Sequence, residues 1–403
     1  MPENHCRRSI GSLCEFVNGN GFRPTEWSPS GLPIIRIQNL NGSQNFNYFN
    51  GEPKPKWLVQ PGDLLFAWAG VKGVSFGPTI WPGPQGVLNQ HIFRVVPKEG
   101  VDKYWLYLAL QVATRRIESN AHGFKASLVH VQKDDITTQV VDLPPLHEQQ
   151  KIAEVLRKWD EALEKLASLR ESKLRRHREL TKALVFGSWQ LEKFRTTNEV
   201  AHYRWFQLPA SWNCQQIGEL SVEISERNGE GDQHEVLSCS KHEGFVRSLE
   251  YFKKQIFSSD LTGYKKIWRG DFGFPSNHIE EGSIGLQNLA DTGVVSPIYT
   301  VFRFNPDEVL AEYAFAVLKT ELYRHIFEIS TSASVDRRGS LRWSEFSRIP
   351  FPVPPLAEQE AIAEVLRASR RELDSLRDEI DAVTRQKRGL MQKLLTGVWR
   401  VSC

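Results

Sequence analysis

The chain has 403 residues, enough for two or more domains, and 40% of them are hydrophobic, enough for real cores. No apolar run approaches about 18 residues and no charged-then-apolar segment opens the chain, so we expect neither a membrane span nor a signal sequence. The net charge of +3 is too small to indicate a partner, and five scattered cysteines without C-x-x-C spacing argue against a disulfide framework or zinc site and favour the reducing cytoplasm.

Residues 1–143 are predicted to form a mixed α/β domain. Three segments have the alternating or clustered apolar residues of strands: Leu32–Leu40, the part of Trp57–Gly70 that follows a Pro-Gly-Asp turn, and Val87–Val96. Tyr104–Ser119 has helical spacing, and Ser119–Ser127 is a polar loop that contains glycine.

A long helix is predicted at residues 144–189, followed by a linker at 190–207, a second globular region at 208–353 and a similar long helix at 354–400. Both helices open with Pro-Pro-Leu and share Ile-Ala-Glu-Val-Leu-Arg. Both stop at a glycine, Gly187 or Gly397, where a left-handed cap is expected. The second copy begins 210 residues after the first, without a gap. This repeat divides the chain into two halves, each a globular region followed by a long helix.

The second helix carries apolar residues at alternating spacings of four and three, which predicts a coiled coil. The first helix keeps this seam at both ends. Its middle holds Arg170, Lys173 and His177, and the apolar positions there slip to Leu169 and Leu174. We therefore expect the two helices to pair with each other, with imperfect packing in this middle section. The seam does not give the direction of pairing, but a two-fold-like arrangement of the halves would require antiparallel helices.

The second globular region repeats the plan of the first weakly. Short matches keep their order while the loops between them vary: Ile10–Leu13 with Ile217–Leu220, Gly62-Asp63 with Gly270-Asp271, Phe93-Arg94 with Phe302-Arg303, and Ser127-Leu128 with Ser340-Leu341. Two similar frameworks with divergent loops are expected if the loops read two different targets. The predicted fold class is α/β (α+β), with two domains in a pseudo-two-fold arrangement separated by two long helices.

The chain lacks several motifs of common enzyme chemistry. It has neither the phosphate loop G-x-x-x-x-G-K-[ST] nor the nucleotide loop G-x-G-x-x-G, and it also lacks H-E-x-x-H and the Asp/Asn-Pro-Pro-aromatic motif of amino-methyltransferases. His278 beside Glu280 and Glu281 could suggest a metal or acid–base site, but a solvated loop is the better explanation. We therefore expect no catalytic residue, no metal ligand and no cofactor in this chain.

Several loops combine amide, basic and hydroxyl side chains, which hold phosphates or match base edges in the major groove. The hydroxyl-rich loop Ser330–Ser340, with two adjacent arginines, is the strongest single candidate. The candidate DNA-binding residues are Arg36, Gln38, Asn39, Lys72, Asn89, Gln90, His91, Lys125, Ser127, Lys241, Lys253, Lys254, Lys265, Lys266, Asn277, His278, Arg337, Arg338 and Ser340.

The motif L-P-P-L-x-E-Q-x-x-I-A-x-V-L, or a close variant of it, stands at Leu143–Leu156 and at Val353–Leu366, each time before a long helix. This doubled arrangement, which covers the whole chain, resembles the specificity subunits of type I restriction–modification systems. The resemblance implies that the globular regions are target recognition domains reading a bipartite, asymmetric DNA site. It also implies that the helices form an antiparallel coiled coil that sets the spacer.

The resemblance further implies two methyltransferase (M) subunits on the helices, restriction (R) subunits, and a bacterial or archaeal cytoplasm. S-adenosylmethionine, ATP and Mg²⁺ would belong to those partners. Motif residues are then candidates for partner contacts, namely Glu148, Gln149, Ile152, Glu358, Gln359 and Ile362. One alternative is a coiled-coil scaffold with two protein-binding heads and no DNA role. Residues 201–353, which hold 16 basic and 20 acidic side chains, agree with that alternative. Another is a self-contained nuclease or methyltransferase with a divergent site.

Overall fold

The computed structural model describes residues 6–120, 128–230, 234–241, 243–331 and 340–401. They fold as two compact units, unit 1 (Met1–Ala167 and Asp378–Cys403) and unit 2 (Ser168–Arg377). The boundary between the units crosses both long helices, α5 (Leu146–Val185) and α11 (Leu356–Leu395), so each unit holds one part of each helix.

Unit 1 contains two four-stranded sheets, ordered β2-β10-β6-β8 and β4-β3-β9-β5. The first is antiparallel throughout, and its inner face packs Phe66 and Phe93 against Trp105 of α3 in the main core. The helices are α1 (Ile10–Leu13), α2 (Ile37–Leu40), α3 (Lys103–Asn120) and α4 (Lys133–Thr137). The strands are β1 (Cys6–Ser9), β2 (Cys14–Asn18), β3 (Leu32–Ile35), β4 (Asn47–Phe49), β5 (Leu58–Val59), β6 (Leu64–Ala67), β7 (Ala69–Val71), β8 (Gly77–Ile80), β9 (Gly86–Leu88), β10 (Ile92–Pro97), β11 (Leu128–His130) and β12 (Val140–Leu143).

Unit 2 has one four-stranded antiparallel sheet, ordered β16-β23-β20-β21, over a core rich in phenylalanine. Its helices are α6 (Ile217–Leu220), α7 (Ser248–Phe252), α8 (Ala311–Leu318), α9 (Glu321–Ser330) and α10 (Trp343–Phe346). Its strands are β13 (Val200–His202), β14 (Gln207–Pro209), β15 (Asn213–Gln216), β16 (Ser221–Ile224), β17 (Leu237–Ser240), β18 (Gly244–Arg247), β19 (Lys265–Trp268), β20 (Phe272–Pro275), β21 (Gly285–Leu286), β22 (Thr292–Val295), β23 (Tyr299–Phe304) and β24 (Pro350–Val353).

The predicted internal repeat is confirmed by the order of the elements. β1 pairs with β12 just before α5, and β15 pairs with β24 just before α11. The first matched segments are the one-turn helices α1 and α6, and Phe93 and Phe302 lie on the equivalent strands β10 and β23. Gly62 and Gly270 both have positive φ, 84° and 91°, in the turns before β6 and β20. Of the last match, Ser127 lies outside the described residues.

Two of the predicted strands are wrong in detail. Leu32–Leu40 is not one strand, because β3 ends at Ile35 and the one-turn helix α2 follows. There the Asn39 carboxamide oxygen accepts the Arg36 backbone N–H at 3.0 Å and turns the chain. Val87–Val96 is divided between β9 and β10, which belong to different sheets. The helix predicted at Tyr104–Ser119 is confirmed as α3.

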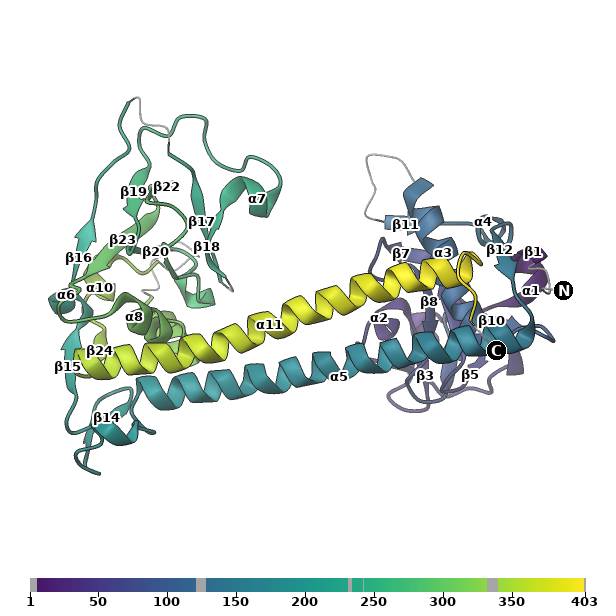
Figure 1. The fold of residues 1–403 in the computed structure, drawn as a ribbon, viewed down its shortest axis with the longest axis horizontal. Coiled ribbons are helices and arrows are strands. Elements are labelled where there is room, and N and C mark those ends of the chain that lie inside the picture. Colours follow the sequence, from purple (N-terminus) through teal and green to yellow (C-terminus); the bar gives the residue numbers. More distant parts are fainter. Residues whose placement is uncertain (1–5, 121–127, 231–233, 242, 332–339, 402–403) are drawn as a thin grey trace. The chain divides into compact units, whose positions relative to one another are not determined.

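The two long helices run antiparallel and side by side in each unit (Figure 1). In unit 1, Asp160 of α5 pairs with Lys387 of α11. In unit 2, Lys173 meets Glu372 at 2.7 Å, and one turn later His177 Nδ1 meets the Ser369 hydroxyl at 3.0 Å. Because the numbers rise on one helix as they fall on the other, the pairing is antiparallel. Both helices reach their glycine caps, with φ of 66° at Gly187 and 70° at Gly397.

The polar middle of the first seam faces the partner helix. Arg170, Lys173 and His177 are partly buried, whereas Leu169 is 44% exposed, so the predicted slip to Leu169 is wrong. The polar residues keep the seam because α11 supplies Glu372 and Ser369 opposite them. At Arg170 the buried Nε has no hydrogen-bond partner among the described residues, while the imperfect packing expected in this section stays a prediction.

Acid should weaken this part of unit 2 through His177. Burial, followed by the nearby charge of Arg370, lowers the pKa of His177 below its ordinary value. The unfolded chain therefore binds a proton more readily than the folded chain as pH falls through the ordinary histidine range near about 6.5, and folding stability falls with it. We expect urea unfolding of unit 2 between pH 8 and pH 5.5 to lose more stability in the native chain than in His177→Gln. An equal loss in both would show that His177 does not contribute.

Candidate nucleic-acid interface

The Glu-Gln pair of the repeated motif attaches each long helix to its globular region. The Gln149 side-chain oxygen accepts the backbone N–H of Asp102, just before α3, at 2.8 Å. Its nitrogen donates to the carbonyls of Gly100 (3.1 Å) and Pro144 (2.9 Å). A side chain from the start of α5 thus holds the residue that caps α3, since the Asp102 carboxylate accepts the Trp105 backbone N–H at 2.8 Å.

Gln359 makes the same three bonds in unit 2. Its oxygen accepts the backbone N–H of Leu310, just before α8, at 2.8 Å, and its nitrogen donates to the carbonyls of Glu308 (2.8 Å) and Pro354 (2.9 Å). Gln359 is completely buried and Gln149 nearly so. The motif therefore forms the same buried connection between helix and globular region in both units. We call the three bonds of Gln149, and the three of Gln359, the joint of each unit.

The glutamate of the pair binds the chain that leaves the other helix. Glu358 accepts bonds from Gln190 (3.1 Å) and from the Trp212 indole (2.9 Å), and burial raises its pKa. In unit 1, Glu148 accepts from Arg400 at 2.9 Å. Arg400 is the residue that the repeat aligns with Gln190, so the two joints are closed in the same way.

These contacts change the interpretation of the residues predicted to bind partner subunits. All of them are 6% exposed or less, and Ile152 and Ile362 lie in the hydrophobic cores. In this structure their side chains have no surface to offer a partner, and any effect on docking would be indirect, through the joint. The residues concerned are Glu148, Gln149, Ile152, Glu358, Gln359 and Ile362.

The first predicted DNA-binding loop of unit 1 surrounds α2. Asn39 is buried and holds the loop, because its nitrogen donates to the carbonyls of Ser43 (3.0 Å) and Asn45 (3.1 Å) while its oxygen caps Arg36. Gln38 is exposed and donates to the Asn45 carbonyl at 3.1 Å. The Arg36 guanidinium lies over the Trp27 ring at 5.5 Å. Gln38 is therefore accessible, Arg36 is partly buried, and Asn39 positions the loop that carries both.

The second group follows β9 and surrounds Trp68. Trp68 donates its indole N–H to the Gln90 carbonyl at 3.1 Å, and its ring lies 5.1 Å from that of His91. The Gln90 amide nitrogen lies 3.3 Å from His91 Nε2. The backbone of Asn89 is bonded to Ile35 at the end of β3. This contact places the Asn89–His91 turn next to the α2 loop, so the structure brings these two groups together.

Lys72 lies beyond β7, where its ammonium donates to the Glu118 carbonyl of α3 at 2.8 Å. It is nevertheless exposed, and it comes from a different turn than the two groups above. Lys125, Ser127, Arg337 and Arg338 were also predicted to bind DNA, but they lie outside the described residues, as does most of the loop Ser330–Ser340.

In unit 2 the lysines predicted to bind DNA differ in exposure and in their hydrogen bonds. The Lys265 ammonium donates to the Tyr299 carbonyl at 2.6 Å, and burial lowers its pKa. Lys266 pairs with Glu226 at 3.1 Å. Lys241, Lys253 and Lys254 are exposed, and Lys253 ends α7 in a left-handed conformation with φ of 54°. Lys253 and Lys254 are therefore the most accessible of this set, together with Lys241.

The remaining predicted residues of unit 2 lie where β20 ends. Asn277 is partly buried and His278 is exposed. Ser340 is joined to this turn through its neighbour Leu341, whose N–H donates to the Ser276 carbonyl at 2.9 Å. Among the described residues, His278, Glu280 and Glu281 bring ligand atoms within 4.8 Å of one another. His278 and Glu281 are exposed, as predicted for a solvated loop, whereas Glu280 between them is partly buried.

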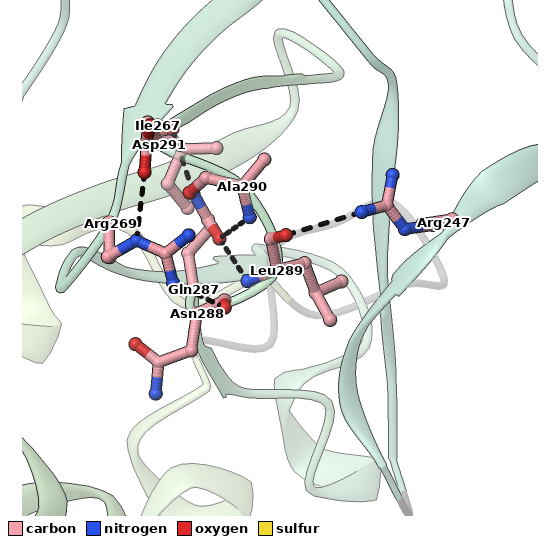
Figure 2. Close-up of polar contacts among 8 residues, drawn as sticks. All are labelled: Arg247, Ile267, Arg269, Gln287, Asn288, Leu289, Ala290 and Asp291. Carbon is pink, nitrogen blue, oxygen red and sulfur yellow. Dashed lines mark hydrogen bonds and ion pairs between the residues drawn. The ribbon is translucent and has the colours of Figure 1, made fainter.

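The structure adds a group that our list of candidates omits. The segment Gln287–Asp291 joins β21 to β22 in unit 2, and Arg247 and Arg269 converge on it from β18 and from the turn after β19 (Figure 2). Its Gln-Asn-Leu sequence also occurs at Gln38–Leu40 in unit 1. That recurrence is the sequence signal that could have identified it.

The comparisons with known proteins agree with this internal architecture. The family described as the type I restriction modification DNA specificity domain matches residues 2–171 and 249–385, more than half of the chain. The chain belongs to this family. Among the described residues, the specificity-domain chain has no helix that is both long and apolar enough to cross a membrane.

Curated relatives of this specificity-domain chain are specificity subunits of type I restriction enzymes. The MjaVIII subunit of Methanocaldococcus jannaschii is 24% identical over 362 residues, 85% of this chain and 80% of that one. The putative MjaX subunit of the same organism is 22% identical over 100% of this chain and 95% of its own. The EcoBI subunit of Escherichia coli is 29% identical over 159 residues, but there the match spans about a third of its length (32%) and 39% of this chain.

Solved structures of low sequence identity show the same fold. The S subunit of a type I restriction–modification system from M. genitalium superposes with a TM-score of 0.52 at 17% identity, over 97% of this chain and 96% of that one. A chain from a structural study of complex assembly and conformational transition in a type I system gives 0.55 at 15% identity, over 98% and 99%. The predicted fold class, with its mixed globular regions and two long helices, is therefore confirmed.

Proposed function

We propose that this chain is the DNA-binding specificity subunit of a type I restriction–modification complex, acting in the cytoplasm, and that it recognises a bipartite, asymmetric DNA site. The observation that carries the proposal is the pairing of one repeated framework with two different sets of loops. Unit 1 carries Arg36, Gln38 and the Asn89–His91 turn beside its second four-stranded sheet, whereas the described residues of unit 2 form no second four-stranded sheet and carry other side chains in their loops. Two different readers in one chain suit a target whose two halves differ.

In this proposal the chain itself is non-catalytic. Methyltransferase subunits dock on the long helices, and restriction subunits complete the complex. S-adenosylmethionine, ATP and Mg²⁺ are held by those partners, which agrees with the lack of nucleotide-loop and methyltransferase motifs in the sequence. Since α5 and α11 each continue from one unit into the other, their length would set the spacer between the half-sites.

Gel-shift or anisotropy measurements with the chain and its methyltransferase partner test the proposal. DNA carrying both half-sites at the native spacing should bind at least about tenfold more tightly than DNA with either half scrambled, since each mismatch costs about 1–3 kcal/mol. The salt concentration must be held constant, because phosphate contacts make affinity depend on it. An assembled complex that binds all these DNAs equally would instead favour the scaffold alternative.

A further inference from the structure

The segment Gln287–Asp291 of unit 2 is exposed at Asn288, Leu289 and Asp291, and hydrogen bonds from the buried Gln287 hold its backbone. Gln287 is completely buried, and its side-chain oxygen accepts the backbone N–H groups of Leu289 (2.7 Å) and Ala290 (3.2 Å). Its nitrogen donates to the Ala290 carbonyl at 2.8 Å and to the Ile267 carbonyl of β19 at 3.4 Å (Figure 2). One buried amide therefore determines the course of this loop.

Two arginines hold the same loop from outside. Arg269 donates from Nη1 to the Asn288 carbonyl at 2.7 Å and from Nε to Asp291 at 3.1 Å. Arg247 donates from Nη2 to the Leu289 carbonyl at 3.3 Å. Their side chains are 52% and 37% exposed. Arg247 also pairs through Nη1 with Glu235. A guanidinium has five N–H donors, so each arginine still keeps donors for a further acceptor such as a DNA phosphate.

The loop presents Asn288 and Leu289 to solvent. The Asn288 amide makes no hydrogen bond to any residue that the structure describes, and in Figure 2 it points away from the network that holds its own backbone. Leu289 next to it is 38% exposed. The free amide offers one donor group and one acceptor on a backbone that is already ordered.

We propose that Asn288 reads a base edge in the half-site of unit 2, and that Gln287 and Arg269 are its positioning residues. The inference rests on the proposed function and identifies residues that would carry it. An asparagine amide matches the adjacent acceptor and donor of adenine in the major groove, and an apolar side chain suits a thymine methyl group. Because the loop is ordered before binding, little of the contact energy is spent on ordering it.

Unit 1 uses the same Gln-Asn-Leu sequence with the roles exchanged. There Asn39 is buried and holds the loop, while Gln38 is exposed. In unit 2 the glutamine is buried and the asparagine is exposed. The exposed side chain is thus a glutamine in unit 1 and a shorter asparagine in unit 2. This difference suits a target whose two half-sites differ.

The test is methylation by the complete complex of a DNA library in which only the second half-site is randomised. In Asn288→Ala the preference at one position of that half should fall about tenfold or more, the loss expected for one bidentate contact. Preference at the other positions and in the first half-site should stay. Arg269→Ala, which frees the loop, should relax the same position.

Asn213→Ala is the matched control, because Asn213 is also exposed in unit 2 but lies on β15, paired with β24. It should leave every preference unchanged. An unaltered second-half preference in Asn288→Ala would overturn this inference and leave the proposed function standing. A native complex without any selective second half-site would overturn both. The melting temperature of Asn288→Ala should match that of the native chain. A lower melting temperature together with the changed preference would assign Asn288 a structural role instead.

Discussion

Replacing Gln359 by methionine should lower the free energy of unfolding of unit 2 by about 2–4 kcal/mol, because three hydrogen bonds are lost and buried backbone groups stay unpaired. Methionine keeps the length of the side chain, so the loss reports the bonds to Leu310, Glu308 and Pro354 more than a cavity. Urea unfolding, followed by tryptophan fluorescence, measures the effect.

Gln149→Met should do the same to unit 1, whose joint has the same three bonds. Gln150→Met is the control, since Gln150 is the next residue of α5 and is exposed. It should change stability by less than about 0.5 kcal/mol. If the Gln359→Met protein were as stable as the Gln150→Met protein, the three hydrogen bonds of Gln359 would not stabilise unit 2 as we propose.

Replacing Phe302 by alanine should cost unit 2 about 3–5 kcal/mol, the usual loss for a large core aromatic. Phe302 is completely buried on the central strand β23. Its ring lies 5.0 Å from that of Phe346, 5.3 Å from Phe272 and 5.7 Å from Trp343, so alanine leaves a cavity that these rings cannot all fill.

In the complex, the Phe302→Ala variant should lose the second half-site and keep the first, because the substitution lies inside one compact unit. Phe93→Ala, at the equivalent position of unit 1, should have the opposite effect. Phe252→Ala, whose ring is 38% exposed, is the control for removal of a phenylalanine. Equal loss of both half-sites in Phe302→Ala would mean that the units do not act separately.

The parts of the fold that follow from local sequence were predictable. The long helices, their glycine caps and the repeat rest on spacing and on proline and glycine, and the structure has them. The division of Leu32–Leu40 was not predictable from spacing, because one side-chain bond from Asn39 to Arg36 decides it. Nor was the role of the Glu-Gln pair, since Gln149 and Gln359 reach partners 47 and 49 residues away.

The candidate interface was less predictable than the fold. Residue type identified polar loops, but it does not tell an exposed amide from a buried one, and Asn39 and Lys265 are bonded inward. Gln287 was not predictable for the same reason: three of its four bonds stay within a loop that has no unusual composition, and the fourth goes to Ile267 of β19. The recurrence of Gln-Asn-Leu in both halves is the sequence signal that could have indicated it.

The most direct test of the specificity role is single-molecule mapping of methylated bases in DNA from cells that express this chain with its cognate methyltransferase. We predict one new motif, split by a spacer of constant length, with different sequences in its halves and adenine methylated in both. A palindromic or continuous motif, or no motif from a complex shown to be assembled, would contradict this prediction.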